Sequence, residues 1–162
     1  MNASVVAPLL LVSLLSTVNA FADVVSDPEL VQITAMRAEL SRFAPGKFTA
    51  PRAFCVGVKA HVGDPSPEFL SALSSAYPKL VPLGSCKEEC PNQDGEALQY
   101  PRPPLLECGY ITAGDVWFEP DGQANLTVIF TAGPLWVRTG VYKLRRAGTE
   151  WKIIGYELRT IS

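Results

Sequence analysis

The sequence predicts an α+β fold in which two helices pack on a mainly antiparallel sheet that ends in a four-stranded meander. Three observations lead to this prediction. Helix signals lie in the first half of the chain, strand signals separated by tight turns fill the second half, and four cysteines lie within or on either side of the loop between the halves. A block of helices before a block of hairpin-connected strands is typical of α+β domains.

The first 22 residues contain no Lys, Arg, Asp, Glu or His and carry an apolar run from Val5 to Val18. That run is shorter than the roughly 20 residues that cross a bilayer, and Ala20-Phe21-Ala22 matches the small-residue pattern of a cleavage site. We therefore predict a signal peptide over residues 1–22, a single α+β domain over 23–162, and a secreted or periplasmic location. Cleavage after Ala20 and a retained membrane anchor are the alternatives.

Composition limits the class of partner. The chain has 14 basic and 16 acidic residues and a formal net charge of -2. Nucleic-acid binding needs clustered basic groups that displace counterions, so this balance argues against a nucleic-acid partner. Once the signal is removed, the sequence also predicts no stable membrane span.

Two helices are expected before the sheet. The first begins at Ser26-Asp27-Pro28-Glu29, where a capping side chain, a proline and an acidic residue follow one another, and it ends near Pro45. The second begins with the same logic at Asp64-Pro65-Ser66-Pro67 and ends before Pro78. Between them, Ala53 to Val62 alternates in the manner of a strand.

The segment 78–104 is rich in proline and is predicted to be a loop. The four cysteines, Cys55, Cys86, Cys90 and Cys108, allow three pairings, and their even number fits an oxidising compartment. Strands that lie side by side favour Cys55 with Cys86, which leaves Cys90 with Cys108 to staple the loop. A zinc site that uses Cys86 and Cys90 is the alternative, although the other two thiols lack the compact spacing of such sites.

Four strand-like runs follow the loop. They are Leu105 to Glu119, Gln123 to Ala132, Leu135 to Arg146 and Glu150 to Ile161, and turn residues separate each run from the next. Their spacing predicts the antiparallel meander.

The segment Thr149 to Ile154, at the start of the last strand, resembles the closing strand of nuclear-transport-factor-like (cystatin-like) domains, in which a Trp and an alternating basic and apolar run end a curved sheet. The resemblance implies a cone-shaped α+β fold. The chain also resembles small secreted bacterial proteins of unknown function, and that likeness implies no particular chemistry.

The chain offers few residues for catalysis. His61 is the only histidine, no serine lies in a nucleophile elbow, and no glycine-rich phosphate loop is present. His61 and Asp115 are the candidate bases, and an ordinary surface position is the alternative for each. No cofactor or metal is predicted.

Aromatic residues concentrate in the terminal strands. If the face opposite the aliphatic one is concave, Trp136, Tyr142 and Tyr156, with Arg138 beside them, line a pocket for a ligand there. Packing of the same rings beneath the helices is the favoured interpretation. We therefore expect a non-catalytic module that binds a small apolar ligand or a protein. A small hydrolase or isomerase that uses a cavity on the curved sheet is the alternative.

Overall fold

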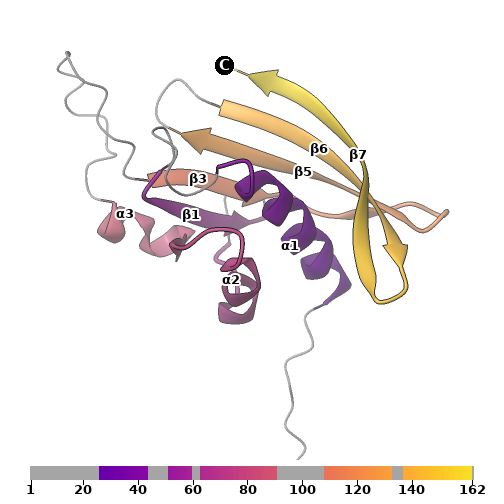
Figure 1. Ribbon diagram of the computed structural model, residues 1–162, viewed down its shortest axis with the longest axis horizontal. Coiled ribbons are helices and arrows are strands. Elements are labelled where there is room, and N and C mark those ends of the chain that lie inside the picture. The colour runs from indigo at the N-terminus through magenta and orange to yellow at the C-terminus, as the bar shows by residue number, and fades with distance from the viewer. Residues whose placement is uncertain (1–25, 44–50, 60–62, 91–107, 133–136, 162) are drawn as a thin grey trace, which may run out of the picture.

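A computed structural model describes residues 26–43, 51–59, 63–90, 108–132 and 137–161 of the chain. The predicted signal peptide lies outside the described residues. Within them the protein has the predicted α+β architecture: helices pack against a mostly antiparallel mixed sheet (Figure 1). The helices are α1 (Asp27–Leu40), α2 (Pro67–Leu73), α3 (Cys86–Glu89) and a short 3-10 turn, Leu83–Ser85; the strands are β1 (Ala53–Val58), β2 (Leu80–Pro82), β3 (Cys108–Ala113), β4 (Trp117–Phe118), β5 (Gln123–Ala132), β6 (Val137–Ala147) and β7 (Glu150–Ile161).

The strands lie in the order β2-β1-β3-β5-β6-β7, and β4 pairs with the first part of β5. The neighbouring pairs from β3 to β7 are antiparallel, whereas β1 runs parallel to both β2 and β3. Two details differ from the sequence prediction. The first of the four expected runs is divided into β3 and β4 by the bend at 114–116, and the segment predicted as a loop from residue 78 contains β2 and α3.

Both predicted helix starts are confirmed. Ser26 and Glu29 form a capping box, in which the Ser26 backbone N–H donates to Glu29 Oε2 at 2.9 Å. Ser66 caps α2 by accepting a hydrogen bond from the Phe69 backbone N–H at 3.1 Å. These local bonds satisfy N–H groups that have no partner within the helix, so each helix begins where its cap lies.

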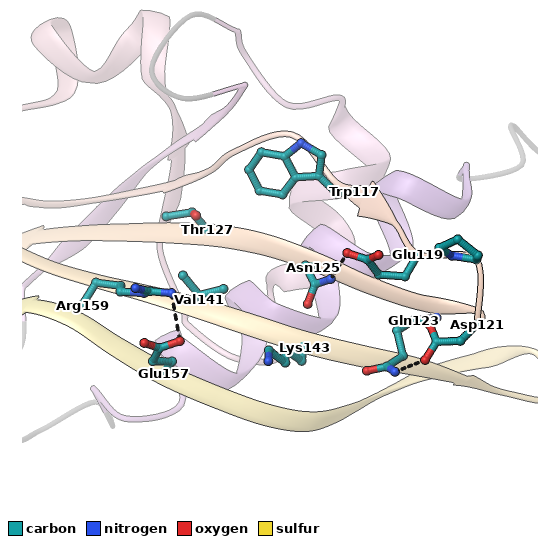
Figure 2. A pocket seen from close by; sticks show the side chains of 11 residues that line it. Trp117, Glu119, Asp121, Gln123, Asn125, Thr127, Val141, Lys143, Glu157 and Arg159 are labelled. Carbon is teal, nitrogen blue, oxygen red and sulfur yellow. Dashed lines mark hydrogen bonds and ion pairs between the residues drawn. The ribbon is translucent and has the colours of Figure 1, made fainter.

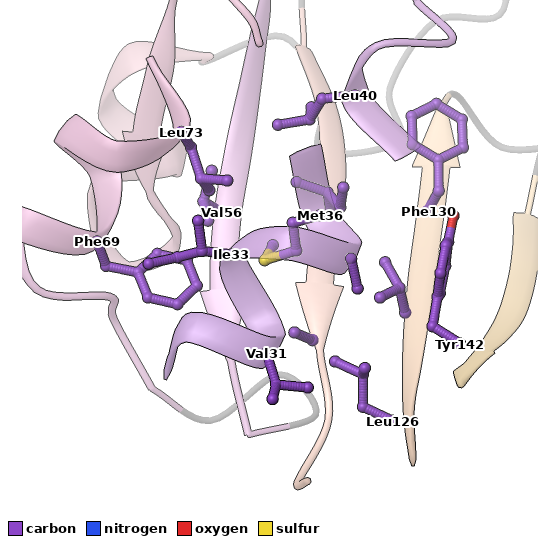
Figure 3. Close-up of a cluster of buried hydrophobic side chains, with 14 of the residues drawn as sticks. Val31, Ile33, Met36, Leu40, Val56, Phe69, Leu73, Leu126, Phe130 and Tyr142 are labelled. Carbon is purple, nitrogen blue, oxygen red and sulfur yellow. The ribbon is translucent and has the colours of Figure 1, made fainter. Parts of the chain in front are cut away.

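The main core fills the space between the helices and one face of the sheet (Figure 3). Helix α1 contributes Val31, Met36 and Leu40, and β5 contributes Leu126 and Phe130, all of them buried. We call this covered side the helix face. Burial of these side chains is the main source of stability for a domain of this size.

A second cluster covers the opposite side of the sheet at its β2–β1–β3 end. It contains the two disulfides, Cys55–Cys86 and Cys90–Cys108, together with Ala53 and Val81. The pairing is the one that strand adjacency favours, and no described cysteine is left as a free thiol. The sulfurs of Cys55, Cys90 and Cys108 lie within 4.8 Å of one another, so the two bonds pack together.

The disulfides fit the oxidising compartment that the sequence predicts. In the part of the chain that the structure describes, no helix combines the length and the apolar character needed to cross a bilayer.

Candidate functional site

The three described residues of the candidate pocket lie on the helix face and not on a separate aromatic face, which for Tyr142 and Tyr156 is the core packing favoured from the sequence. Tyr142 pairs with Leu126 and Arg138 pairs with Phe130 across β5 and β6, and Tyr156 pairs with Tyr142 across β6 and β7. Residues directly opposite in a sheet share a face. The aromatic and aliphatic side chains therefore belong to one core, and Tyr142 is 1% exposed within it. The fourth predicted residue, Trp136, lies outside the described residues.

A buried carboxylate organises this cluster. Glu39, near the end of α1, accepts a hydrogen bond from the Tyr142 hydroxyl and is 2% exposed. Its two oxygens each lie 3.4 Å from an arginine Nε, Oε2 from Arg42 and Oε1 from Arg138. Arg138 in turn donates to the Tyr156 hydroxyl from Nε at 3.0 Å and from Nη2 at 2.8 Å.

The environment shifts the acidity of two members of the cluster. Burial, together with the adjacent Glu39 carboxylate, raises the pKa of Tyr142 well above its usual range. Burial opposes the charge of Arg138, but the hydrogen bond to Tyr156 and the attraction of Glu39 outweigh it and raise its pKa. Tyr142 is therefore a neutral donor and Arg138 a fixed cation at ordinary pH.

The Glu39 cluster holds α1 on the sheet through closely packed side chains. The Tyr142 and Tyr156 rings pack 4.9 Å apart, and the Arg42 guanidinium lies 4.8 Å from the centre of the Tyr156 ring. These ring contacts and ion pairs form a packed polar core. Glu39 was not predicted as a core residue, and the signal in the sequence is a carboxylate that lies beside the apolar positions Met36 and Leu40 of the helix.

The opposite side of β5, β6 and β7 is not covered by any described helix, and we call it the open face (Figure 2). A groove of about 680 Å³ lies on it, a volume within the range of small-molecule sites. Its lining residues come from the β4–β5 turn region and from three neighbouring strands: Trp117, Glu119, Pro120, Asp121, Gln123, Asn125, Thr127, Val141, Lys143, Glu157 and Arg159.

The strand register explains why these side chains meet. Trp117, Asn125 and Lys143 stand opposite one another on β4, β5 and β6, and this row ends at Gly155 on β7. The next row along the strands is Thr127, Val141 and Glu157. Because glycine has no side chain, the first row leaves room beside Lys143 at its β7 end.

Trp117 is the most exposed large apolar side chain among the described residues, at 57%. Its exposed ring makes this part of the open face a candidate binding surface. Its neighbour Phe118 points to the other side, where its ring lies 5.8 Å from that of Trp151.

The polar groups of the groove are largely held in pairs. Arg159 contacts Glu157 at 3.0 Å, and Asn125 donates to Glu119 at 3.1 Å. The Gln123 amide hydrogen-bonds Asp121 and thereby lowers the pKa of that carboxyl. These contacts fix the orientation of the amide and carboxylate groups that line the groove. Lys143 is exposed and has no ion-pair partner among the described residues.

Of the two candidate bases, Asp115 lies within the described residues. Asp115 lies exposed at the bend between β3 and β4 and is not among the lining residues. His61 lies outside the described residues. Among the residues that the structure describes, the groove carboxylates do not come close enough to one another to form a set of three metal ligands.

The groove was not predicted as a site. Trp117 is one of several aromatics in the terminal strands and was not singled out from the sequence, because only the register places it beside Asn125 and Lys143. Searches against protein-family models, curated proteins and solved structures find no match to this chain.

Proposed function

We propose that this protein is an exported, non-catalytic binding module whose binding site is the groove on the open face. The observation that carries the proposal is the exposure of Trp117 beside a row of pre-oriented polar groups. Antiparallel sheets commonly pack one face on the core and leave the other in contact with solvent, where it is accessible to a ligand.

The location of the groove supports a binding role. The helix face is filled by the main core, and the β2–β1–β3 end of the open face is covered by the disulfide cluster. The groove therefore lies on a rigid framework, and a site on strands is positioned more firmly than one on loops. Its lining is more polar than the apolar pocket expected from the sequence, so the ligand is a polar molecule with an apolar face.

Saturation-transfer NMR tests the proposal with a library of amino acids, nucleotides, fatty acids, saccharides and short peptides. We expect at least one class to bind saturably to the wild type and to lose binding in Trp117→Ala. Phe118→Ala is the matched control, because that ring is 49% exposed, adjacent in sequence and directed to the other side. An absence of binding across the library, or equal binding by Trp117→Ala, overturns the proposal.

A further inference from the structure

The chemistry of the groove identifies a ligand class, an inference that rests on the proposed binding function. We infer that the groove binds a carbohydrate, with one pyranose ring stacked on Trp117 and its hydroxyls held by Asn125, Lys143 and Glu157.

The Trp117 indole is the aromatic surface on which a sugar ring would stack. A pyranose has a face of C–H groups that packs on an indole ring, and the Trp117 ring is exposed at the groove with no ring contact to another described residue. Trp117 and Asn125 are directly opposite on β4 and β5. A sugar on the indole therefore has its edge toward the polar row that begins at Asn125.

The polar side chains of the groove match the hydroxyls of a sugar. Each sugar hydroxyl both donates and accepts, so a matching site needs donors and acceptors side by side. The row offers them in order: the amide of Asn125, the ammonium of Lys143 and, in the next row, the carboxylate of Glu157. Asn125 and Glu157 are already held by Glu119 and Arg159, which lowers the entropy lost when they bind a ligand.

The lining does not suit phosphates, nucleic acids, fatty acids or an added peptide strand. The lining has three carboxylates, from Glu119, Asp121 and Glu157, against two cations, so a phosphate or a nucleic acid would meet a net negative surface. A fatty acid chain would displace water from these polar groups and offer them no hydrogen bonds in return. The groove lies on the face of the sheet and not along its edge, so a peptide cannot add to it as a strand.

The open shape of the groove suits a polymer. The lining extends from the β4–β5 turn at Pro120 to Arg159 on the edge strand β7. A chain of sugars can therefore cross three strands, with one residue on Trp117 and its neighbours over Val141 and Glu157.

Affinity electrophoresis tests the inference in gels that contain β-glucan, xylan, galactomannan or polygalacturonate, with a gel that contains no polysaccharide as the reference. Sedimentation with chitin and with peptidoglycan extends the test to insoluble polymers. We expect at least one polymer to bind the wild type and Phe118→Ala, and Trp117→Ala to bind it at least about tenfold more weakly. Trp117→Phe keeps a smaller ring and is expected to bind between the two.

Two results overturn the inference. One is that none of the six polymers binds the wild type; the other is that Trp117→Ala binds as tightly as Phe118→Ala. If no polymer binds but a non-saccharide of the NMR library binds in a Trp117-dependent way, the carbohydrate class is wrong while the binding function stands. Circular dichroism of each variant excludes loss of fold, which is not expected because the Trp117 side chain is outside the core.

Discussion

Glu39 and Tyr142 are 103 residues apart in the chain and share a buried hydrogen bond that joins α1 to β6. The same carboxylate contacts Arg42 and Arg138, so one side chain connects a helix end with the two strands that form the last hairpin. Removing one partner of a buried ion pair strongly destabilises a protein, because the charge that remains is buried without compensation.

Glu39→Ala is expected to lower the free energy of unfolding by about 3 kcal/mol or more, because it leaves the Tyr142 hydroxyl without its acceptor and Arg138 without its ion-pair partner on α1. Urea denaturation measures this loss. Glu89→Ala is the control: its ion pair with Lys79 is about half exposed, so its removal is expected to cost less than about 1 kcal/mol. Equal losses in the two variants would contradict a structural role for Glu39.

The raised pKa of Tyr142 predicts a dependence of stability on alkaline pH. Because the folded-state pKa is above the ordinary value of 10.0, the folded protein holds this proton more tightly than the unfolded chain. The stabilisation is complete below pH 10 and is lost as the pH rises above it, at up to about 1.4 kcal/mol per pH unit.

Urea denaturation of wild type and Tyr142→Phe between pH 8 and 11.5 checks this dependence. The wild type is expected to lose more stability than the variant above pH 10. Burial also raises the pKa of Tyr77, but that residue is present in both proteins, so the difference between them isolates Tyr142. Parallel curves would show that Tyr142 titrates normally.

Gly140 makes room for a ring of the Glu39 cluster. A Cβ at this position would lie 2.5 Å from a carbon of the Tyr156 ring, whereas a Cβ at Gly155 would meet the Lys143 side chain at 3.5 Å, an ordinary contact. Gly140→Ala is therefore expected to lower stability by about 1–3 kcal/mol, and Gly155→Ala to have a much smaller effect. Thermal unfolding of the two variants compares them, and similar melting temperatures would contradict close packing at Gly140.

The disulfides are expected to stabilise the domain by restricting the unfolded chain. The bonds span 31 and 18 residues, and loops of that length contribute roughly 3 to 4 kcal/mol each in the entropic model. The double variant Cys90→Ser, Cys108→Ser should lose about 3 kcal/mol. Peptide mapping without reduction should show Cys55 linked to Cys86; a Cys55–Cys90 peptide would contradict the pairing.

Local signals explain which parts of the fold were predictable. The helix starts are set by neighbouring residues such as Ser26 and Glu29, and the long strands follow from alternation and turn residues, so both were predicted correctly. Strand β2 has three residues and α3 has four, which is too short for periodicity to show. Their place in the fold depends on β1 and on the disulfides.

The site depended on information that a single sequence lacks. Alternation within β6 separates its two faces but does not say which one meets Leu126 of β5; the observed register pairs Leu126 with Tyr142 and puts both under the helices. Irregular pairing near Thr139 and Lys143 further changes which residues of β7 face the core. The row from Trp117 to Lys143 is likewise a product of register.

The location of the bound ligand is measured by backbone amide chemical shifts of ¹⁵N-labelled protein titrated with an oligosaccharide of the polymer that binds. If the groove is the carbohydrate site, the largest shifts lie at Trp117, Asn125, Val141 and Glu157 on the open face, with the Trp117 side-chain N–H among them. Shifts concentrated instead around Glu39, Arg138 and Tyr156 on the helix face would contradict it.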